Sequence, residues 1–444
     1  MLTLEAMRKR SRHVYYGWWM AWAGALINCV GAFYTQGFSV FFIPFREALG
    51  LSSAQTAFVL SAAKLQGGLE GPLAGWLIDR FGSHRMQTVG AAITGVGFIL
   101  LGLFVHDYLT LILAYLAVIS VGFNMGFSQA NLAAMNTWFI RHRTLVMSMQ
   151  TMGSRVGGFL LVPLISVVVL TWGWRTGAIV IGIIILAVAV PLSAVFRRSP
   201  ESMGLRPDGD PPSDTADSKP ANRPAHGHGG RVISGSQGDF EVKEAFHSPS
   251  YWILAFAVAM RSTVHTAVIV HLVPMMVTKG MSQQGGANML GLLALFGAPL
   301  ALSLGWLGDR VDKRRLLAFS MLMGTLGVLL LQFSQSTWQL YIVVGLVTFS
   351  ESVGTLAWSL LGEFFGRTRF ATLRGTMTFI QGAANFIGPV YAGIVVDRTG
   401  NYDEALTVFA IASAICAMVY FLMRPPALPL RLRQDSHVEQ PAGS

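Results

Sequence analysis

Gly75-Trp76-Leu77-Ile78-Asp79-Arg80 returns later in the chain as Gly305-Trp306-Leu307-Gly308-Asp309-Arg310. Each copy stands at the exit of a long apolar segment and is followed by further basic residues. A second shared block lies at nearly the same offset, because the pattern that starts at Phe139 starts again at Phe365. Two homologous helical halves in one membrane protein are typical of a secondary transporter, whose substrate site lies between the repeats near the bilayer midplane.

The composition indicates a membrane protein. The 444 residues are 53% hydrophobic and 12% charged, whereas an average soluble domain carries about 25% charged residues. Apolar stretches close to the ~20 residues that a spanning helix needs occur twelve times, at approximately 17–43, 54–78, 86–105, 109–138, 143–171, 175–196, 250–278, 284–308, 315–333, 338–364, 372–397 and 402–423. We therefore expect an all-α membrane protein with twelve transmembrane helices in two six-helix pseudo-symmetric bundles.

The chain divides into four regions by composition. Residues 197–248 are rich in Pro, Gly, Ser, Asp and His, and such a segment cannot bury enough apolar area to order itself. His226 and His228 within it have no third ligand nearby, so no metal site is predicted. The predicted regions are an N-terminal bundle (1–196), a flexible cytoplasmic linker (197–248), a C-terminal bundle (249–424) and a disordered cytoplasmic tail (425–444).

The net charge of +10 is explained by topology and does not require a nucleic-acid partner. With both termini in the cytoplasm, only four basic residues outside the spans fall on the outer side, namely Arg46, Arg175, Lys279 and Arg398. The reverse orientation would violate the positive-inside rule. We expect a monomer in the inner, or plasma, membrane, in contact with lipid.

The loop at Asp79-Arg80 and its copy at Asp309-Arg310 resemble the signature loop of the major facilitator superfamily, and this resemblance covers essentially the whole chain. An acidic side chain at a helix end can pair with Arg and with the N-terminus of a neighbouring helix. We therefore expect these four residues, together with Glu70, to form a conformational gate and not to bind substrate.

A finer resemblance points to the monocarboxylate transporters and their oxalate–formate relatives. Residues 31–42 are similar to the end of that family's first helix, residues 71–82 to the exit of its second, and residues 138–157 to its fifth helix and the junction before it. Gln36 stands where the animal members place a lysine. The resemblance implies transport of a monocarboxylate.

Charged residues inside the spans are few, and each one costs about 2.5–3.5 kcal/mol at the bilayer centre. Arg155 lies in the fifth span, Glu351 lies in the tenth, and Arg261 and His265 share one face of the seventh. Lys64 lies in the second span. In the superfamily that the chain resembles, helices 1, 4, 7 and 10 line the central cavity, which implies that Arg261, His265 and Glu351 face the substrate path.

A functional and a structural interpretation are both open for four of these residues, namely Arg155, Arg261, His265 and Glu351. Arg155 and Arg261 can bind a carboxylate through the planar guanidinium fork, or can form a structural Arg–Glu pair that ties the halves together. His265 can bind substrate and carry a proton, or can be a hydrogen-bonded core residue. Glu351 is the candidate for proton coupling, and its alternative is a permanent salt bridge.

Five neutral residues complete the predicted substrate site: Tyr34, Gln36, Asn124, Gln381 and Asn385. Any one of them is more often a hydrogen bond in helix packing than a ligand. No nucleotide-binding loop, catalytic triad or metal-ligand cluster occurs, so we predict neither an enzyme nor a cofactor.

The predicted function is secondary active transport of a small organic anion, a mono- or dicarboxylate, by alternating access, coupled to protons or to anion exchange. Two alternatives stay open. One is proton-driven efflux of amphipathic or drug-like compounds, and the other is a transporter-like solute sensor without net flux.

Overall fold

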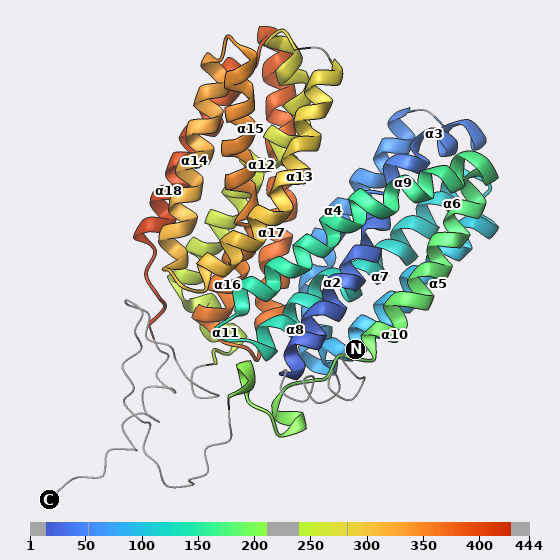
Figure 1. Cartoon of the computed structure of the whole chain (residues 1–444), viewed down its shortest axis with the longest axis vertical. Coiled ribbons are helices and arrows are strands. Elements are labelled where there is room, and N and C mark those ends of the chain that lie inside the picture. The colour runs from blue at the N-terminus through green and yellow to red at the C-terminus, as the bar shows by residue number, and fades with distance from the viewer. Residues whose placement is uncertain (1–14, 52, 211–238, 282, 428–444) are drawn as a thin grey trace, which may run out of the picture.

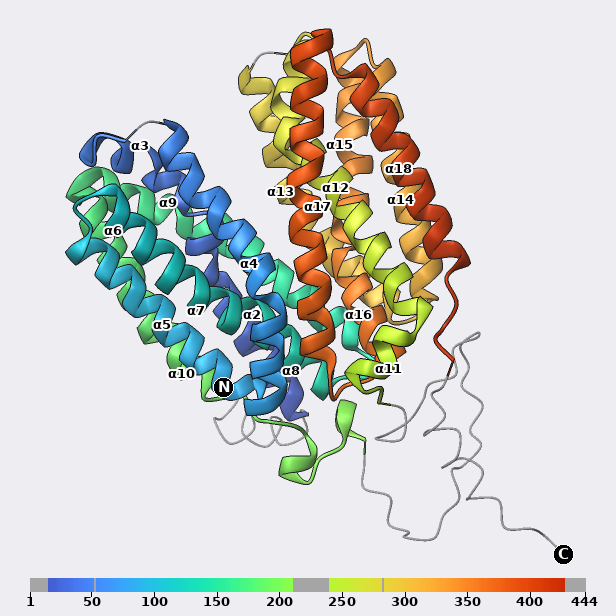
Figure 2. The same cartoon turned by 180° about the vertical axis from the view of Figure 1, so that it is seen from behind.

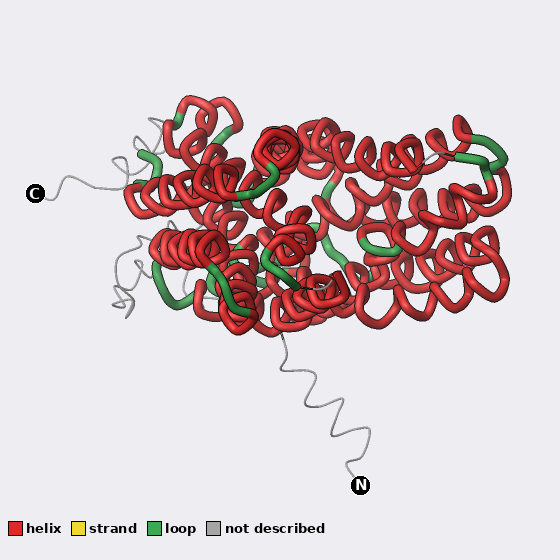
Figure 3. Tube along the Cα trace, turned by 90° about the horizontal axis from the view of Figure 1, so that it is seen from above, coloured by secondary structure: helices red, strands yellow, loops and turns green. Residues whose placement is uncertain are grey.

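The computed structural model describes residues 15–51, 53–210, 239–281 and 283–427, and within these ranges the chain forms helices joined by turns and short loops, without strands. Figure 3 shows this organisation from above. Two bundles lie side by side, meet at one end and diverge towards the other (Figure 1 and Figure 2). We call the end where they meet, marked by Gly82, Phe139 and Gly366, the linker side, and the opposite end the distal side.

The first bundle is built from the N-terminal half. Its elements are α2 (Tyr16–Thr35), α3 (Phe38–Ala48), α4 (Ser53–Phe81), α5 (Ser83–Phe104), a continuous run from α6 (Tyr108–Ile112) through α7 (Val121–Phe123) to α8 (Ala130–Trp138), α9 (Arg143–Ile184) and α10 (Val190–Ser193). The run from α6 to α8 contains two π-helical stretches, 113–120 and 124–129. Such stretches insert extra residues into a turn and are frequent at functional sites.

The long helix α9 is two spans joined by a glycine. Gly173 has φ 83° and ψ 161°, a backbone conformation that residues with a Cβ rarely adopt. The chain therefore turns at Gly173 and crosses back towards α10. This single position converts one helical run into the fifth and sixth spans that the sequence predicts.

The second bundle is built from the C-terminal half. Its elements are α11 (Val242–His247), α12 (Pro249–Thr278), α13 (Gln283–Gly308), α14 (Lys313–Phe333), α15 (Thr337–Ser352), α16 (Gly354–Phe365), α17 (Phe370–Thr399) and α18 (Asp403–Leu422). Only Val353 separates α15 from α16, so the tenth span is broken two residues after Glu351.

The prediction of two helical bundles with twelve spans is confirmed. Nine helical segments among the described residues are long and apolar enough to cross a membrane. One of them, Arg143–Ser193, is divided at Gly173. Helices α4 and α13, with 29 and 26 residues, add two more of sufficient length.

Small residues let the bundles approach closely at the linker side. A Cβ placed on Gly71 would collide with the backbone of Gly375, and one placed on Gly75 would collide with Ala371, so α4 and α17 touch backbone to backbone. Such contacts stabilise helix pairs in lipid, where hydrophobicity alone does not drive association. On the other side of the molecule, Gly308 of α13 packs against the side chains of Leu356 in α16 and Thr144 in α9.

Both described ends of the predicted linker form structure. Asp208 accepts hydrogen bonds from the backbone N–H groups of Ile140 and Arg141, at 3.0 and 2.9 Å. Asp239 accepts one from the N–H of Arg367, at 2.8 Å, in the matching turn of the other half. Glu201 pairs with that same arginine at 3.0 Å. Residues at both described ends of the linker thus contact the two halves, and the flexibility of the linker stays a prediction.

Parts of the predicted linker and tail lie outside the described residues. These are residues 211–238, which include both histidines considered as metal ligands, and residues 428–444.

Candidate functional site

The aspartate of each repeated loop caps a helix in the opposite half. Asp79, at the end of α4, accepts hydrogen bonds from the backbone N–H of Ala371 (3.3 Å) and of Thr372 (2.9 Å), and from the Thr372 hydroxyl (2.6 Å). These groups belong to the first turn of α17. A carboxylate is favoured there because the N–H groups at a helix N-terminus lack partners within the helix.

Asp309 repeats this geometry across the other face of the molecule. Its two oxygens accept hydrogen bonds from the N–H groups of Thr144 (2.8 Å) and Leu145 (2.9 Å), in the first turn of α9. Burial raises the pKa of the Asp309 carboxyl, and these hydrogen bonds oppose the shift. The predicted gate aspartates thus hold the two halves together at the linker side.

The arginines of the loops take a different position. The guanidinium of Arg80 lies 5.1 Å from the ring of Trp76, and that of Arg310 lies 3.5 Å from the ring of Trp306. Each is a cation–π contact with the tryptophan one helical turn earlier. The repeated pattern Gly-Trp-Leu-x-Asp-Arg contains this spacing, so the stacking could have been found from the sequence.

A buried polar layer lies behind the aspartates, and the sequence does not predict how its residues pair. The hydroxyls of Ser148 and Thr355 are 2.8 Å apart. In the same layer Arg374, only 6% exposed, donates to Gln129 at 2.7 Å and stacks on Trp358. The Ser148–Thr355 and Arg374–Gln129 hydrogen bonds join one half to the other and close the linker side, whereas the stacking on Trp358 lies within the C-terminal half.

Further into the bilayer, Arg155 and Glu351 form an ion pair between the halves. Arg155 Nη2 of α9 donates to Glu351 Oε2 of α15, and His265 Nε2 of α12 lies 3.8 Å from Glu351 Oε1. The three side chains keep 16%, 19% and 27% of their surface exposed. The structure therefore brings together three of the five charged residues predicted inside the spans in one partly buried cluster.

This cluster lies near the middle of the predicted spans. Contacts between α9 and α13 extend from Thr144 and Gly308 to Arg155 and Gly297. On α9, Arg155 lies eleven residues after Thr144. At a helical rise of 1.5 Å per residue, this separation is ~16 Å along the helix axis. The hydrocarbon core is about 30 Å thick. The ion pair thus stands about halfway across, where a substrate site between the repeats is expected.

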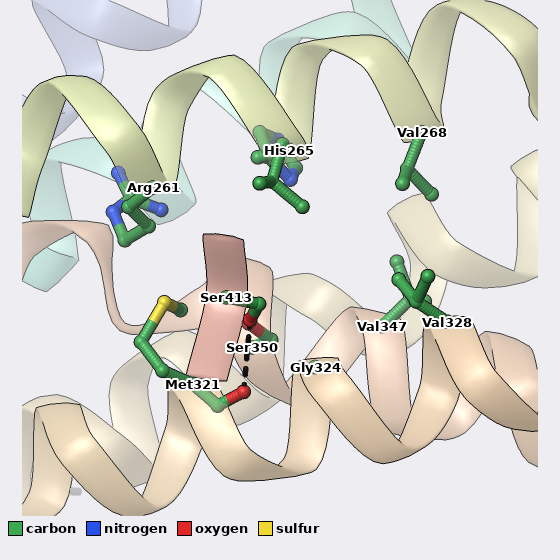
Figure 4. A pocket seen from close by; sticks show the side chains of 10 residues that line it. Arg261, His265, Val268, Met321, Gly324, Val328, Val347, Ser350 and Ser413 are labelled. Carbon is green, nitrogen blue, oxygen red and sulfur yellow. Dashed lines mark hydrogen bonds between the residues drawn. The ribbon is translucent and has the colours of Figure 1, made fainter. Parts of the chain in front are cut away.

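Arg261 occupies a different environment. It is 9% exposed, and its Nε is buried without a hydrogen-bond partner. With His265, one turn further along α12, it lines a cavity of about 30 Å³ bounded by α14, α15 and α18, all in the C-terminal half (Figure 4). The two residues do share one face, as predicted, but only His265 reaches Glu351.

Two of the predicted neutral residues of the N-terminal half, Tyr34 and Asn124, belong to one hydrogen-bond network through Ser120. The Tyr34 hydroxyl is 3.0 Å from Ser120 Oγ, and its ring stacks on Phe123. Asn124, in the second π-helical stretch, donates to Glu70 at 3.3 Å. Glu70, predicted as part of the gate, therefore bonds to a residue that was predicted to bind substrate, and both belong to the same half.

The remaining predicted residues connect neighbouring helices. Gln36 donates to the backbone carbonyl of Ser154 at 3.1 Å. Gln381 donates to Ser262 at 2.6 Å. In the same pair of helices, α17 and α12, the Asn385 side chain accepts from Thr266 at 2.9 Å. The side chain of Lys64 lies outside what the structure describes.

Comparison with known proteins agrees with this architecture. A family model described as the Major Facilitator Superfamily matches residues 21–310 and 288–443. Human monocarboxylate transporter 11 is 24% identical over 424 residues, which are 93% of this chain and 84% of that protein. Human monocarboxylate transporter 6 is 26% identical over 413 residues, which are 89% and 79% of the two chains. Mouse monocarboxylate transporter 12 is 24% identical over 431 residues, which are 92% of this chain and 86% of that protein.

Solved structures show the same fold at lower identity. The transporter FucP in the outward conformation matches with a TM-score of 0.66 at 15% identity, covering 91% of this chain and 98% of that one. The proton:xylose symporter XylE matches with a TM-score of 0.68 at 14% identity, covering 94% and 98%. The paired helix caps follow from a duplicated sequence, and the family model matches both copies: the chain belongs to the major facilitator superfamily and is an integral membrane transporter that resembles the monocarboxylate transporter branch.

Proposed function

We propose that this protein moves a small organic anion, a mono- or dicarboxylate, by alternating access and in symport with a proton. The observation that carries the proposal is the Arg155–Glu351 ion pair between the halves, with His265 beside it. In the proposed orientation the linker side is cytoplasmic, in the inner or plasma membrane, so the structure corresponds to a state closed towards the cytoplasm.

The ion pair suggests how binding of an anion and of a proton are linked. A guanidinium binds a carboxylate in the same planar, bidentate way whether the carboxylate belongs to the protein or to a ligand. While Glu351 is ionised, it occupies Arg155. A ligand carboxylate that takes its place would leave Glu351 as an uncompensated buried charge, which is strongly unfavourable. Protonation of Glu351 removes that charge, so anion and proton bind together.

His265 can assist this exchange. Its Nε2 lies close enough to Glu351 Oε1 for a small movement to form a hydrogen bond, and 27% of its side chain is exposed. A histidine in this position can pass a proton to the carboxylate or donate to the bound anion. With the anion bound and Glu351 protonated, the cluster carries the same net charge as it does without the anion and with Glu351 ionised.

Alternating access requires the cross-half contacts to break together. The contacts between α9 and α13 extend from the linker side to Arg155, and the bundles diverge towards the distal side (Figure 1). Separating the halves at the linker side therefore also pulls Arg155 away from Glu351. Because breaking a buried ion pair is costly, we propose that protonation and anion binding permit this step.

The names of the relatives support the class of substrate. They are called monocarboxylate transporters and they match this chain over most of its length. A carboxylate is also the ligand that the Arg155 fork fits best. The alternative of efflux of amphipathic compounds is less well supported, because the aromatic side chains around Tyr34 are buried within the N-terminal bundle.

The test is uptake into proteoliposomes of radiolabelled carboxylates, chosen by a thermal-shift screen of the purified protein. We expect accumulation of at least one carboxylate when the outside is acidic, and little when the pH gradient is collapsed. Uptake that depends only on an anion inside the vesicle would indicate exchange and overturn the proton role. Binding without flux would support the sensor alternative, and outward pumping of apolar dyes alone would support efflux.

A further inference from the structure

A second positively charged site lies inside the C-terminal half, next to the ion pair between the halves, and His265 borders both. The cavity beside Arg261 has a volume of about 30 Å³ and is lined by residues of α12, α14, α15 and α18. Its polar lining consists of Arg261, His265, Ser350 and Ser413, and the rest is made of valines, Met321 and Gly324. Figure 4 shows Arg261 and His265 on one side of this space and Ser413 with Met321 on the other.

The charge of Arg261 is not balanced by a contact. Among the described residues no carboxylate lies within ion-pair distance of its guanidinium, and Glu351 is already paired with Arg155. Arg261 is only 9% exposed, and its Nε has no hydrogen-bond partner. On the neighbouring helix α18 the hydroxyl of Tyr420 is also buried without a partner. A buried charge without a counter-charge is strongly unfavourable in a protein interior.

The size of the cavity restricts what can provide that counter-charge. A water molecule needs about 10–15 Å³ of such volume, so the cavity has room for about two or three particles of this size. A halide ion is only slightly larger than a water molecule and fits. An organic anion, with a carbon skeleton behind its carboxylate, does not fit inside.

We infer that the Arg261 cavity binds one monovalent inorganic anion of the size of chloride, held by the guanidinium and by the hydroxyl of Ser350. The Ser413 hydroxyl already donates to the Met321 carbonyl at 3.0 Å, so Ser350 is the hydroxyl available to donate. The bound ion neutralises Arg261 and leaves Arg155 and Glu351 as a balanced pair. The site is thus centred on Arg261 and not on Arg155, although His265 borders both it and the proposed substrate site, and its ligand stabilises the C-terminal half.

The first test uses the wild-type protein in detergent, in gluconate buffer at constant ionic strength and pH and without any carboxylate substrate candidate. We expect equilibrium binding of about one ³⁶Cl⁻ per chain, and a saturable rise of the melting temperature with chloride or bromide. Gluconate is too large for the cavity and should give no rise. If no chloride binds, the cavity holds water only and the inference is overturned.

Variants locate the ion. Arg261→Gln should weaken chloride binding by about tenfold or more, as expected when a charge-assisted contact is removed. Arg374→Gln is the matched control, because it also removes a buried arginine of the C-terminal half but does not line the cavity. We expect it to keep wild-type chloride affinity. If Arg261→Gln does not fold, Ser350→Ala should still weaken binding, and unchanged affinity in that variant would contradict the assignment.

Competition distinguishes the two sites. A transported carboxylate should leave bound ³⁶Cl⁻ in place, because it binds at Arg155. Displacement of one chloride by one carboxylate would show that Arg261 belongs to the substrate site, and would overturn the inference. Since chloride binding is measured without a pH gradient or an organic anion, it can succeed or fail independently of the proposed symport.

Discussion

At the scale of single residues, Glu351 is the residue on which the proposed chemistry depends. It accepts a hydrogen bond from Arg155 of the opposite half and lies 3.8 Å from His265. A carboxylate in this position can be a proton carrier or a permanent partner in an ion pair. These roles differ in what happens when its charge is removed.

Glu351→Gln imitates the protonated carboxyl and frees Arg155. If Glu351 carries the coupling proton, exchange of substrate between preloaded vesicles should continue, whereas uphill uptake driven by a pH gradient should stop. A permanent salt bridge predicts that both modes fail and that the protein loses about 3–5 kcal/mol of stability, because Arg155 is left buried and unpaired. Exchange, uphill uptake and melting temperature measured on this variant separate the two roles.

Arg155→Lys keeps the charge but loses the bidentate fork. We expect carboxylate affinity to fall by about tenfold or more, since an ammonium cannot reproduce two parallel hydrogen bonds. Arg398→Lys, at an exposed position on the distal side, is the control and should behave as wild type. Wild-type affinity in the Arg155 variant, measured by substrate-dependent thermal shift, would exclude a direct contact with the anion.

The sequence identifies these charged residues but not their pairing. A charged group in an apolar span is visible because of its insertion cost, so Arg155, Arg261, His265 and Glu351 could all be found. Which arginine meets Glu351 depends on the rotation and height of α9 and α12 relative to α15. Local periodicity does not contain this information, because it describes one helix at a time.

At the scale of helices, the linker side is held closed by two carboxylates that cap helices across the interface. Asp79→Asn and Asp309→Asn should each weaken this state by about 0.5–2 kcal/mol, the usual range for loss of a helix cap. Transport should slow while substrate affinity stays within about twofold of wild type, since the caps lie ~16 Å from the ion pair. Loss of substrate binding in either variant would show that the aspartates are not a gate.

The contact between α4 and α17 offers a test within one helix. A Cβ on Gly375 would collide with the backbone of Gly71, whereas a Cβ on Gly393 of the same helix meets nothing within 4 Å. Gly375→Val should therefore disfavour the closed linker side by about 1–3 kcal/mol through overpacking, and Gly393→Val should not. The readout is thiol labelling of a cysteine introduced at Ser148, which is buried in the closed state. Equal labelling in the two variants would contradict the packing role.

The helices themselves could be predicted more completely than their contacts. Length and hydropathy marked every span, and Gly173 divides the one long run of helix where the sequence predicts two. The buried layer of Ser148, Thr355 and Arg374 could not be found in this way. Its members are polar or lie near helix ends, and in a linear sequence such residues look like ordinary loop-facing positions.

At the scale of the whole molecule, the described ends of the linker bind both halves. Asp208 caps the turn before α9, and Asp239 caps the equivalent turn before α17. We expect Asp208→Ala combined with Asp239→Ala to speed opening of the linker side without changing substrate affinity. Faster thiol labelling of a cysteine at position 148 in the double variant would support this. An unchanged labelling rate would show that the linker ends do not stabilise the closed linker side.

Each half contributes one aspartate that caps a helix of the other half. This is the pattern of an isologous interface, in which residue i of one partner contacts residue j of the other and residue j of the first contacts residue i of the second. Asp79 reaches Thr372, and Asp309 reaches its counterpart Thr144. An interface of this kind needs no covalent connection. Two copies of a single six-helix protein can therefore associate as a homodimer through the same contacts. In this scheme the two gene copies fused afterwards, and their sequences then diverged. Divergence then explains why Arg155 and Glu351, which are not copies of one another, could appear on opposite halves and make the two sides of the site chemically different.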